Sequence, residues 1–374
     1  MLDRSILLRA SALLLLAAVA QPPTARAGAY MFAGSANGVG IVTHPNGYTG
    51  AGGTLTVTVC IDPAAADAAD MVIPTENVVR TFNARQVSSQ NLVTGAGNDV
   101  PPTAFDWESL LLHEMGHCVG AAHPHLGSES GLGSPSSEYV RSTSGGDAAF
   151  DLDDGADNVI GTPDDQRDDD VNLSWFRKNS NHPFAALPAA IDSNNWSRNL
   201  ADLPAGHSYA SGASSEVATT LGLPNLEAVM HQVQTNDEAQ RELTADDWAV
   251  LRYAESGLDE TANSSDDYTL QLDYVGMGTA CDIVITSVTT GFGQCTIGGT
   301  FLNATHVAIT TASLRYNENF EWYFNPVSNE GNFLPAVPGL SGRPLAFGAF
   351  ALALLGAAVL RQASRPAQGR PTSG

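Results

Sequence analysis

The sequence predicts an α+β fold, because it combines β-branched runs with helical stretches. Residues 54–61 (TLTVTVCI) are rich in Val, Thr and Ile, which is the composition of a strand. After Ser265 comparable runs recur as DYTLQLDYVG, CDIVITSV, HVAITTASLRY and FEWYFNP. Helices are predicted around 74–83 and from Thr103 onward. We expect the later strands to form a small antiparallel β module over residues 261–335.

The second helix carries the residues of greatest chemical interest. In TAFDWESLLLHEMGHCVG, Asp106 stands three residues after Thr103, which is a capping-box pattern, and the following run favours a helix through about Val119. Because His113 and His117 are four residues apart, their imidazoles lie on one helix face and can share a metal ion.

A third histidine extends the pattern, although it cannot lie on the same helix face. His123 is six residues beyond His117, a rotation of about 240° at about 100° per residue. Gly120 provides the remedy, since glycine can adopt the left-handed conformation that ends a helix and turns the chain back. Together with His113, these histidines give three neutral nitrogen ligands and leave one position open, as in catalytic zinc sites. Glu114 adjoins the side where a metal-bound water would lie.

Packing of these histidines in a core is the alternative. Two histidines and a glutamate at HExxH spacing occur in helices by chance and are a weak signal alone. The added glycine and third histidine at fixed spacing are much rarer by composition, which favours a metal site.

The motif HEMGHCVGAAH resembles that of metzincin zinc endopeptidases, and the downstream sequence is most similar to their matrixin branch. Metzincins place a methionine in a tight turn beneath the zinc site, and NLEAVMHQV supplies Met230. The stretch LTADDWAVLRYAESG resembles the matrixin C-terminal helix, with Thr244 as N-cap and Asp247 at its third position. In matrixins the methionine follows the third histidine closely, whereas here a large acidic insertion at about 125–224 separates them.

The resemblance implies a metalloprotease domain over residues 28–260, with a twisted sheet and the zinc helix above and a smaller lower part that contains Met230. It implies hydrolysis of a protein or peptide substrate: zinc activates a water molecule, and Glu114 is the general base that passes its proton to the leaving amine. The rival interpretation is a non-catalytic envelope protein whose metals stabilise a surface for adhesion or binding. That interpretation leaves Glu114 without a function.

The insertion contains an aspartate-rich stretch, DLDDGADNVIGTPDDQRDDDVN. Hard oxygen ligands on a turn-rich loop suit Ca²⁺, and so dense a cluster would repel itself without a cation. The spacing differs from an EF-hand loop, and a solvated acidic loop is the alternative. The candidate calcium ligands are Asp151, Asp153, Asp157, Asp164, Asp165 and Asp168.

Four cysteines form an even set that can pair in an oxidising compartment. Cys281 and Cys295 flank DIVITSVTTGFGQ, which we interpret as strand, turn and strand, and we predict a local disulfide between them. Cys60 and Cys118 then remain, either paired with each other or with Cys118 buried as a free thiol on the zinc helix.

Composition and the two ends of the chain limit partners and location. The chain has 17 Lys and Arg against 40 Asp and Glu, a net charge of −23, so no nucleic-acid partner is expected. Residues 1–27 combine two arginines, a short apolar run and an Ala-Arg-Ala site, which predicts a secretory signal peptide. Residues 344–360 carry no charge, are just long enough to cross a membrane, and precede three arginines.

The layout of residues 336–374 resembles the C-terminal sorting tails of bacterial envelope proteins. It implies that a processing protease acts on the tail. We therefore expect an exported protein, located in the cell envelope or outside the cell and anchored at least transiently by its C-terminal segment.

Overall fold

The computed structural model describes residues 27–33, 37, 40–123, 142–143, 150–151, 174–179, 183–184, 187–199, 202, 215–220, 222–231 and 233–332. These belong to one compact unit that extends to Asn332, and residues 333–374 form a second unit outside them. The predicted signal peptide, the C-terminal tail and most of the acidic loop lie outside the described residues. Among the described residues, no helix combines the length and apolar character that a membrane span requires.

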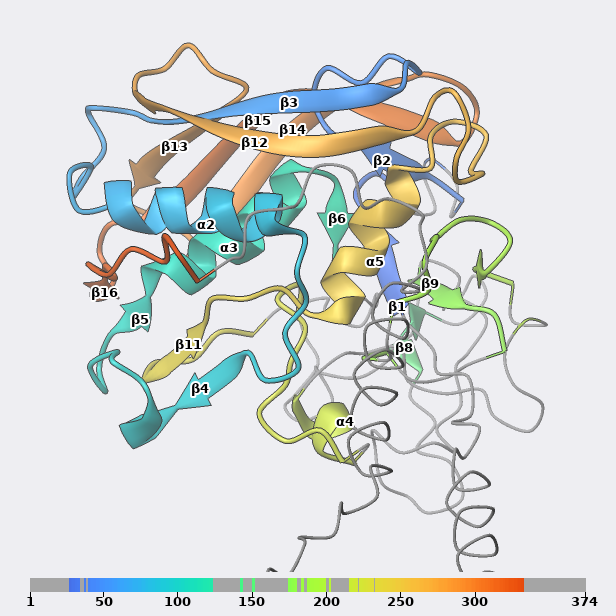
Figure 1. The fold of residues 1–374 in the computed structure, drawn as a ribbon. Coiled ribbons are helices and arrows are strands. Elements are labelled where there is room, and N and C mark those ends of the chain that lie inside the picture. Colours follow the sequence, from blue (N-terminus) through green and yellow to red (C-terminus); the bar gives the residue numbers. More distant parts are fainter. Residues whose placement is uncertain are drawn as a thin grey trace, which may run out of the picture. The chain divides into compact units, whose positions relative to one another are not determined.

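A six-stranded sheet forms one layer of the fold (Figure 1). Its strands are β2 (Val42–His44), β3 (Gly53–Ile61), β12 (Tyr268–Met277), β13 (Ile283–Val288), β14 (Gly293–Phe301) and β15 (His306–Asn317). The strand order is β12-β3-β13-β15-β14, and β2 pairs with the first residues of β15. Neighbouring strands are parallel except β14 and β15. β14 is therefore an antiparallel edge strand, with β15 as its only partner among the described residues.

The prediction of a separate antiparallel module at 261–335 is wrong, because its strands share the sheet of β3. Val57, Val59 and Ile61 of β3 are buried, and β12 and β13 flank this strand in parallel register. Pairing on both edges satisfies the backbone N–H and C=O groups of this apolar strand. These groups would lack partners if the later strands formed a sheet of their own.

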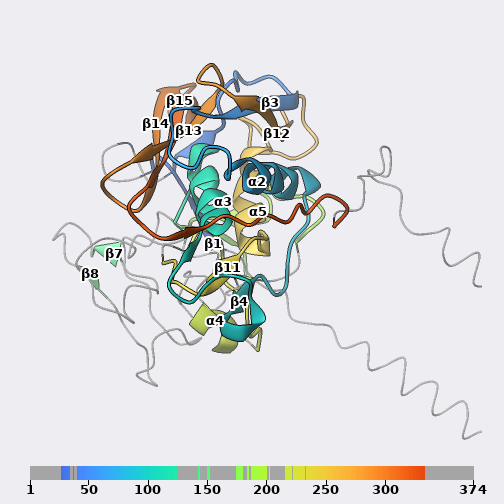
Figure 2. The ribbon, with the colours of Figure 1, turned by 90° about the vertical axis from the view of Figure 1, so that its left-hand side faces the viewer.

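Two helices, α2 (Val72–Ala84) and α3 (Trp107–Cys118), lie side by side on one face of this sheet (Figures 1 and 2). Buried side chains such as Phe82 of α2 and Leu111 and Met115 of α3 join the main hydrophobic core. α2 contacts β12, whereas α3 contacts β14 and β15. Both helices were predicted. Helix α3, which carries His113, Glu114 and His117, packs beside the edge strand β14.

A four-stranded antiparallel sheet lies next to the end of α3. Its order is β10 (Trp196–Ser197), β9 (Ser174–Arg177), β1 (Ala27–Tyr30), β6 (Ala121–Ala122). The segment predicted as an insertion at about 125–224 therefore contributes part of the core. Trp175 and Trp196 are buried in the main core. A few large aromatic side chains can anchor a segment that shows no apolar periodicity, since each buries a large area.

The remaining elements are short. They are β4 (Leu92–Thr94), η1 (Gly95–Gly97), β5 (Phe105–Asp106), β7 (Ser142–Thr143), β8 (Phe150–Asp151), α4 (Ser215–Thr220), β11 (Glu238–Gln240), α5 (Ala245–Ala254) and β16 (Trp322–Tyr323). β4 pairs with β11 and β5 with β16, and α5 contacts β1 and β2. A few helices and several sheets place the chain in the general α+β class.

Both predicted cysteine pairings are wrong, since Cys60 is bonded to Cys281 and Cys118 to Cys295. The predicted hairpin would have placed Cys281 beside Cys295, but β15 lies between β13 and β14. β13 lies next to β3, which brings Cys281 to Cys60. β14 contacts α3, which brings Cys295 to Cys118 and leaves no free thiol at that helix.

Candidate metal centre

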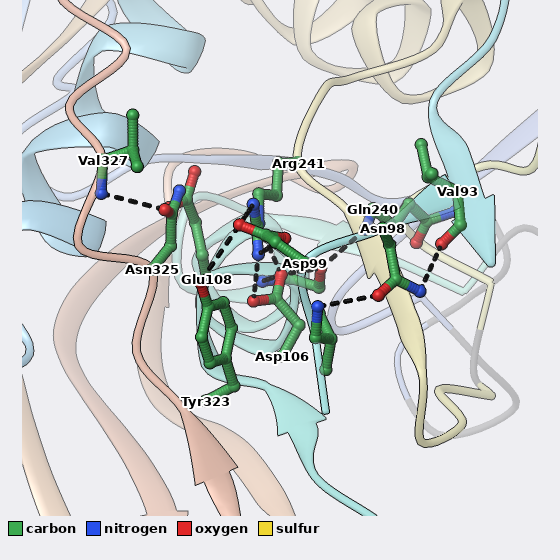
Figure 3. Close-up of polar contacts among 12 residues, drawn as sticks. Val93, Asn98, Asp99, Asp106, Glu108, Gln240, Arg241, Tyr323, Asn325 and Val327 are labelled. Atoms are coloured by element: carbon green, nitrogen blue, oxygen red, sulfur yellow. Dashed lines mark hydrogen bonds and ion pairs between the residues drawn. The ribbon is translucent and has the colours of Figure 1, made fainter. Parts of the chain in front are cut away.

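A carboxylate and a guanidinium fix the N-terminus of α3. Asp106 is the N-cap, and its side chain accepts the Ser109 N–H at 3.1 Å. The predicted cap at Thr103 is wrong, because Thr103 lies in a turn and Phe105 and Asp106 still form strand β5, which pairs with β16, before the helix begins. Arg241 donates two hydrogen bonds of 2.8 and 2.9 Å to the same carboxylate, as Figure 3 shows. Since Asp106 is fully buried, this bidentate pair holds the helix start in place.

Glu108 ties the first turn of α3 to two further segments. Its carboxylate accepts a hydrogen bond from Nδ2 of Asn77 in α2 at 2.9 Å. It accepts a second one from Nδ2 of Asn325 at 2.8 Å, and Figure 3 shows Asn325 beside Glu108. Burial raises the pKa of Glu108 to about 7. Residues from three distant parts of the chain therefore anchor the beginning of the helix.

Three histidine side chains converge at the other end of α3. The Nε2 atoms of His113 and His117 lie 3.1 Å apart, and each lies 3.2 Å from Nε2 of His123. They form one of the two groups of metal-type side chains with mutually close ligand atoms in the described part of the chain. The structure thus brings together all three histidines singled out from the sequence.

Backbone carbonyls fix the tautomer of two of these rings. Nδ1 of His113 lies 2.5 Å from the Val229 oxygen, and Nδ1 of His117 lies 2.9 Å from the Ala121 oxygen. A carbonyl can only accept, so both Nδ1 atoms carry the proton and both Nε2 atoms present lone pairs. Burial lowers the pKa of His113 to about 3, which keeps this ring neutral. Two facing lone pairs cannot hydrogen-bond each other, and they suit a bound cation.

Gly120 allows His123 to reach this group. Its φ is +112°, and a Cβ added there would lie 2.7 Å from the Thr43 backbone oxygen. Immediately after the glycine, β6 pairs with β1, with Ala121 opposite Tyr30. The predicted reversal of the chain at Gly120 is confirmed, and the pairing with β1 sets its direction.

The spacing of the three nitrogens fits a tetrahedral zinc ion. Ligands at 2.0–2.1 Å from zinc and at tetrahedral angles lie about 3.3–3.4 Å apart. The observed separations of 3.1 and 3.2 Å fall close to this value. His113, His117 and His123 would therefore hold the ion through three neutral imidazoles.

Glu114 lies beside the histidines in a cleft of about 440 Å³. The cleft is lined by α3, by the segment around Val229 and by residues 292–295 at the start of β14. Glu114 is 5% exposed, and burial raises its pKa to about 8, while a hydrogen bond from the Cys295 backbone opposes that shift. Its Oε2 atom is buried and has no hydrogen-bond partner among the described residues. A cation on the histidines would favour the charged carboxylate.

Met230 packs directly against α3, the helix that carries His113 and His117. A Cβ added to Gly116 would lie 2.3 Å from the Met230 sulfur. Residue 116 stands between His113 and His117 in the sequence, and only glycine at this position leaves room for the methionine side chain. The adjoining Val229 carbonyl is the one that orients His113. The segment named from the sequence therefore lies where it can support the histidines.

Asp247 is a supporting residue whose full role the sequence did not reveal. The capping box of α5 is confirmed, with Asp247 accepting the Thr244 N–H at 2.7 Å. The same carboxylate accepts the N–H groups of Val229 at 3.1 Å and Met230 at 2.9 Å. Only its capping pattern was visible in the sequence, and the link to the methionine turn depends on tertiary contacts.

The calcium prediction stays a prediction. Five of its six aspartates lie outside the described residues, and Asp151 is described only as part of β8. A different acidic group, Asp259, Asp266 and Asp267, was not singled out from the sequence. Each of these three carboxylates accepts a backbone N–H of its own loop, including that of Leu258 to Asp266 at 2.6 Å, which accounts for the cluster as loop structure.

The chain was compared with protein families, curated proteins and solved structures, and none of them matches.

Proposed function

We propose that this protein is a zinc-dependent endopeptidase that resembles the matrixin branch of the metzincins. The observation that carries the proposal is the convergence of three Nε2 atoms, two with lone pairs fixed by backbone carbonyls, beside a buried glutamate in a cleft. A site that only stabilised the fold would not require a buried carboxylate oxygen without a partner at this place.

Each part of the cleft has a role in the proposed reaction. Zinc bound by the three histidines would supply Lewis-acid activation of water and of the scissile carbonyl. Glu114 accepts the proton of the attacking water and delivers it to the leaving amine. Val229 and Ala121 keep Nδ1 of His113 and His117 protonated, so that Nε2 stays available.

The edge of the main sheet supports a peptide as the substrate. Residues 292–295 line the cleft, and β14 pairs on one side only among the described strands. An extended peptide can add to such an edge through backbone hydrogen bonds. This mode of binding places a scissile bond beside Glu114 without selecting a side chain.

We further propose that the protein acts outside the cytoplasm, at the cell envelope. Two disulfides support this location, because such bonds persist in oxidising compartments. The predicted signal peptide and C-terminal tail agree with it.

The substitution Glu114→Gln tests the proposed reaction. It preserves side-chain size and zinc binding but removes the base, so cleavage should fall by about 10²–10⁴-fold. The measurement is hydrolysis of a broad peptide library, with zinc content determined for each protein.

Glu108→Gln is the matched control, because Glu108 is a buried glutamate of the same helix that does not line the cleft. It should cleave at close to the wild-type rate. If the zinc-loaded wild type cleaves nothing, or if Glu114→Gln cleaves as fast, the endopeptidase proposal is wrong. A non-catalytic, metal-stabilised binding protein would then be favoured.

A further inference from the structure

We propose that the Cys118–Cys295 disulfide and Gly293 position Glu114, by holding β14 so close to α3 that the Cys295 backbone N–H orients the glutamate carboxylate. The catalytic consequence rests on the proposed endopeptidase function. The contact itself does not, and it can be measured separately.

The Cys118–Cys295 disulfide joins α3 to strand β14, which lines the cleft. Cys118 follows His117 directly at the end of α3, and Cys295 lies in β14, which lines the cleft. Both cysteines are buried. The bond therefore ties the strand to the part of the helix that carries a metal ligand.

Gly293 permits the close approach. A Cβ built on it would lie 2.3 Å from Cδ1 of Leu110 and 2.9 Å from Oε1 of Glu114. Residues two apart in a strand point to the same face, so Gly293 and Cys295 both face α3. Gly293 allows the strand to approach α3 closely, and Cys295 is covalently bonded to Cys118 of that helix.

The Cys295 N–H is the contact that reaches the carboxylate. The backbone at Cys295 opposes the rise in the pKa of Glu114, as an N–H close to the carboxylate would, whereas Oε2 of Glu114 has no hydrogen-bond partner among the described residues. In the proposal this backbone group orients the carboxylate, while the close approach of Gly293 to Oε1 holds the strand beside it and Oε2 stays available. Because β14 is an edge strand, paired with β15 alone in the described part of the chain, its other side gives no comparable restraint.

The second disulfide provides a matched control. Cys60 and Cys281 join β3 to the segment before β13, and neither residue lines the cleft. The two bonds close chain segments of similar length, 177 residues for Cys118–Cys295 and 221 residues for Cys60–Cys281. Their loss should therefore destabilise the fold to a similar extent.

The experiment compares Cys118→Ala/Cys295→Ala with Cys60→Ala/Cys281→Ala in the full chain. Amide hydrogen exchange at residue 295 should accelerate about 10-fold or more in the first variant and stay at the wild-type rate in the second, because only the first frees β14 from α3. With zinc content unchanged, kcat should fall about 10²-fold in the first variant with little change in KM, as expected when a reacting group is misplaced. The control should keep its kcat.

A second substitution tests the same contact with both disulfides intact. Gly293→Ala should push β14 from the helix, accelerate exchange at Cys295 and lower kcat. Gly278→Ala should do neither, since a Cβ there meets nothing within 4 Å. The Gly293→Ala variant also keeps the proposal testable if the variant that lacks Cys118 and Cys295 fails to fold.

Equal exchange at residue 295 in wild type, in the Cys118/Cys295 variant and in Gly293→Ala would overturn the proposal. So would a kcat loss as large in the Cys60/Cys281 control. If the wild type cleaves no peptide, the proposed function fails, and the exchange rates alone still decide whether the disulfide and Gly293 hold the carboxylate.

Discussion

His123 approaches the other two histidines because a single glycine reverses the chain. With φ at +112° and the Thr43 oxygen 2.7 Å from the position of a Cβ, Gly120 combines an unusual backbone conformation with a close contact. A β-carbon at this position would act on the metal site through the backbone, without touching a ligand.

We expect Gly120→Ala to destabilise the fold by about 1–3 kcal/mol from backbone strain, with a further loss from the contact with Thr43. Displacement of His123 should also lower the zinc content. Denaturant unfolding and elemental analysis measure the two effects. Gly276→Ala is the control, since Gly276 has φ +92° with nothing within 4 Å and lies far along the sequence. It should lose stability but keep its zinc, and equal zinc content in both variants would contradict the proposed role of Gly120.

The cap of α5 and the methionine turn share one carboxylate. Asp247 accepts from the backbone of Thr244, Val229 and Met230, and it is fully enclosed. Burial raises its pKa, and the donated hydrogen bonds oppose the shift. A helix terminus and a support of the metal centre are therefore coupled.

We expect Asp247→Asn to lower the free energy of unfolding by about 2–4 kcal/mol, because the amide group directs a donor at N–H groups that need an acceptor. Zinc affinity should fall as well, since Val229 orients His113. Urea unfolding and zinc titration check this. Asp273→Asn, on an exposed position of β12, should change neither quantity. Wild-type zinc affinity in Asp247→Asn would separate the turn from the metal centre.

β2 and β15 meet at a buried pair of histidines. Nε2 of His44 lies 2.8 Å from Nδ1 of His306, and the rings stack with centroids 5.1 Å apart. Burial, followed by the nearby His306, lowers the pKa of His44 to about 3. The folded protein therefore holds His44 neutral across a range in which the unfolded chain protonates it.

This shift predicts the direction of a pH dependence. The stability contribution of neutral His44 is complete above its ordinary pKa of about 6.5 and is lost as pH falls toward 3, at up to about 1.4 kcal/mol per pH unit. His44→Gln should make the fall in unfolding free energy between pH 6 and pH 4 shallower by up to this amount. Tyr48→Phe is the control, because Tyr48 stacks on His44 at 4.3 Å and does not titrate in this range. An unchanged slope in His44→Gln would show that another group controls the dependence.

The chain divides into a unit that carries the candidate site and a C-terminal unit that begins at Phe333. All residues assigned to the metal centre lie in the first unit. Anchoring and hydrolysis are therefore separable in the proposed function.

We expect deletion of residues 344–374 to release the protein from the cells into the medium, because the predicted apolar segment is then missing. Zinc content and any hydrolysis should stay at the level of the full chain. Cell fractionation measures the distribution, and a variant that replaces the three C-terminal arginines controls for effects of the charged tail. If the truncated protein stays with the envelope, the tail is not its anchor.

The convergence of His113, His117 and His123 could be predicted from the sequence because its signals are local. Ligand spacing in HEMGHCVGAAH, the glycine after the helix and the capping box at Thr244 each depend on a few consecutive residues and on helix geometry. The strands over 54–61 and after Ser265 follow from local composition in the same way. These elements form where they were expected, with ends shifted by a few residues.

Pairings between distant segments could not be predicted, because they depend on which apolar surfaces are buried together. Placement of β15 between β13 and β14 rules out the local disulfide and brings Cys295 to Cys118. The same arrangement sets edge strand β14 over Glu114, while Asp247 meets Met230 through a turn far from its own helix. A strand is stabilised most when its backbone groups are hydrogen-bonded along both edges and its side chains bury the apolar faces of α2 and α3. No short stretch of sequence specifies which partner strand makes both possible.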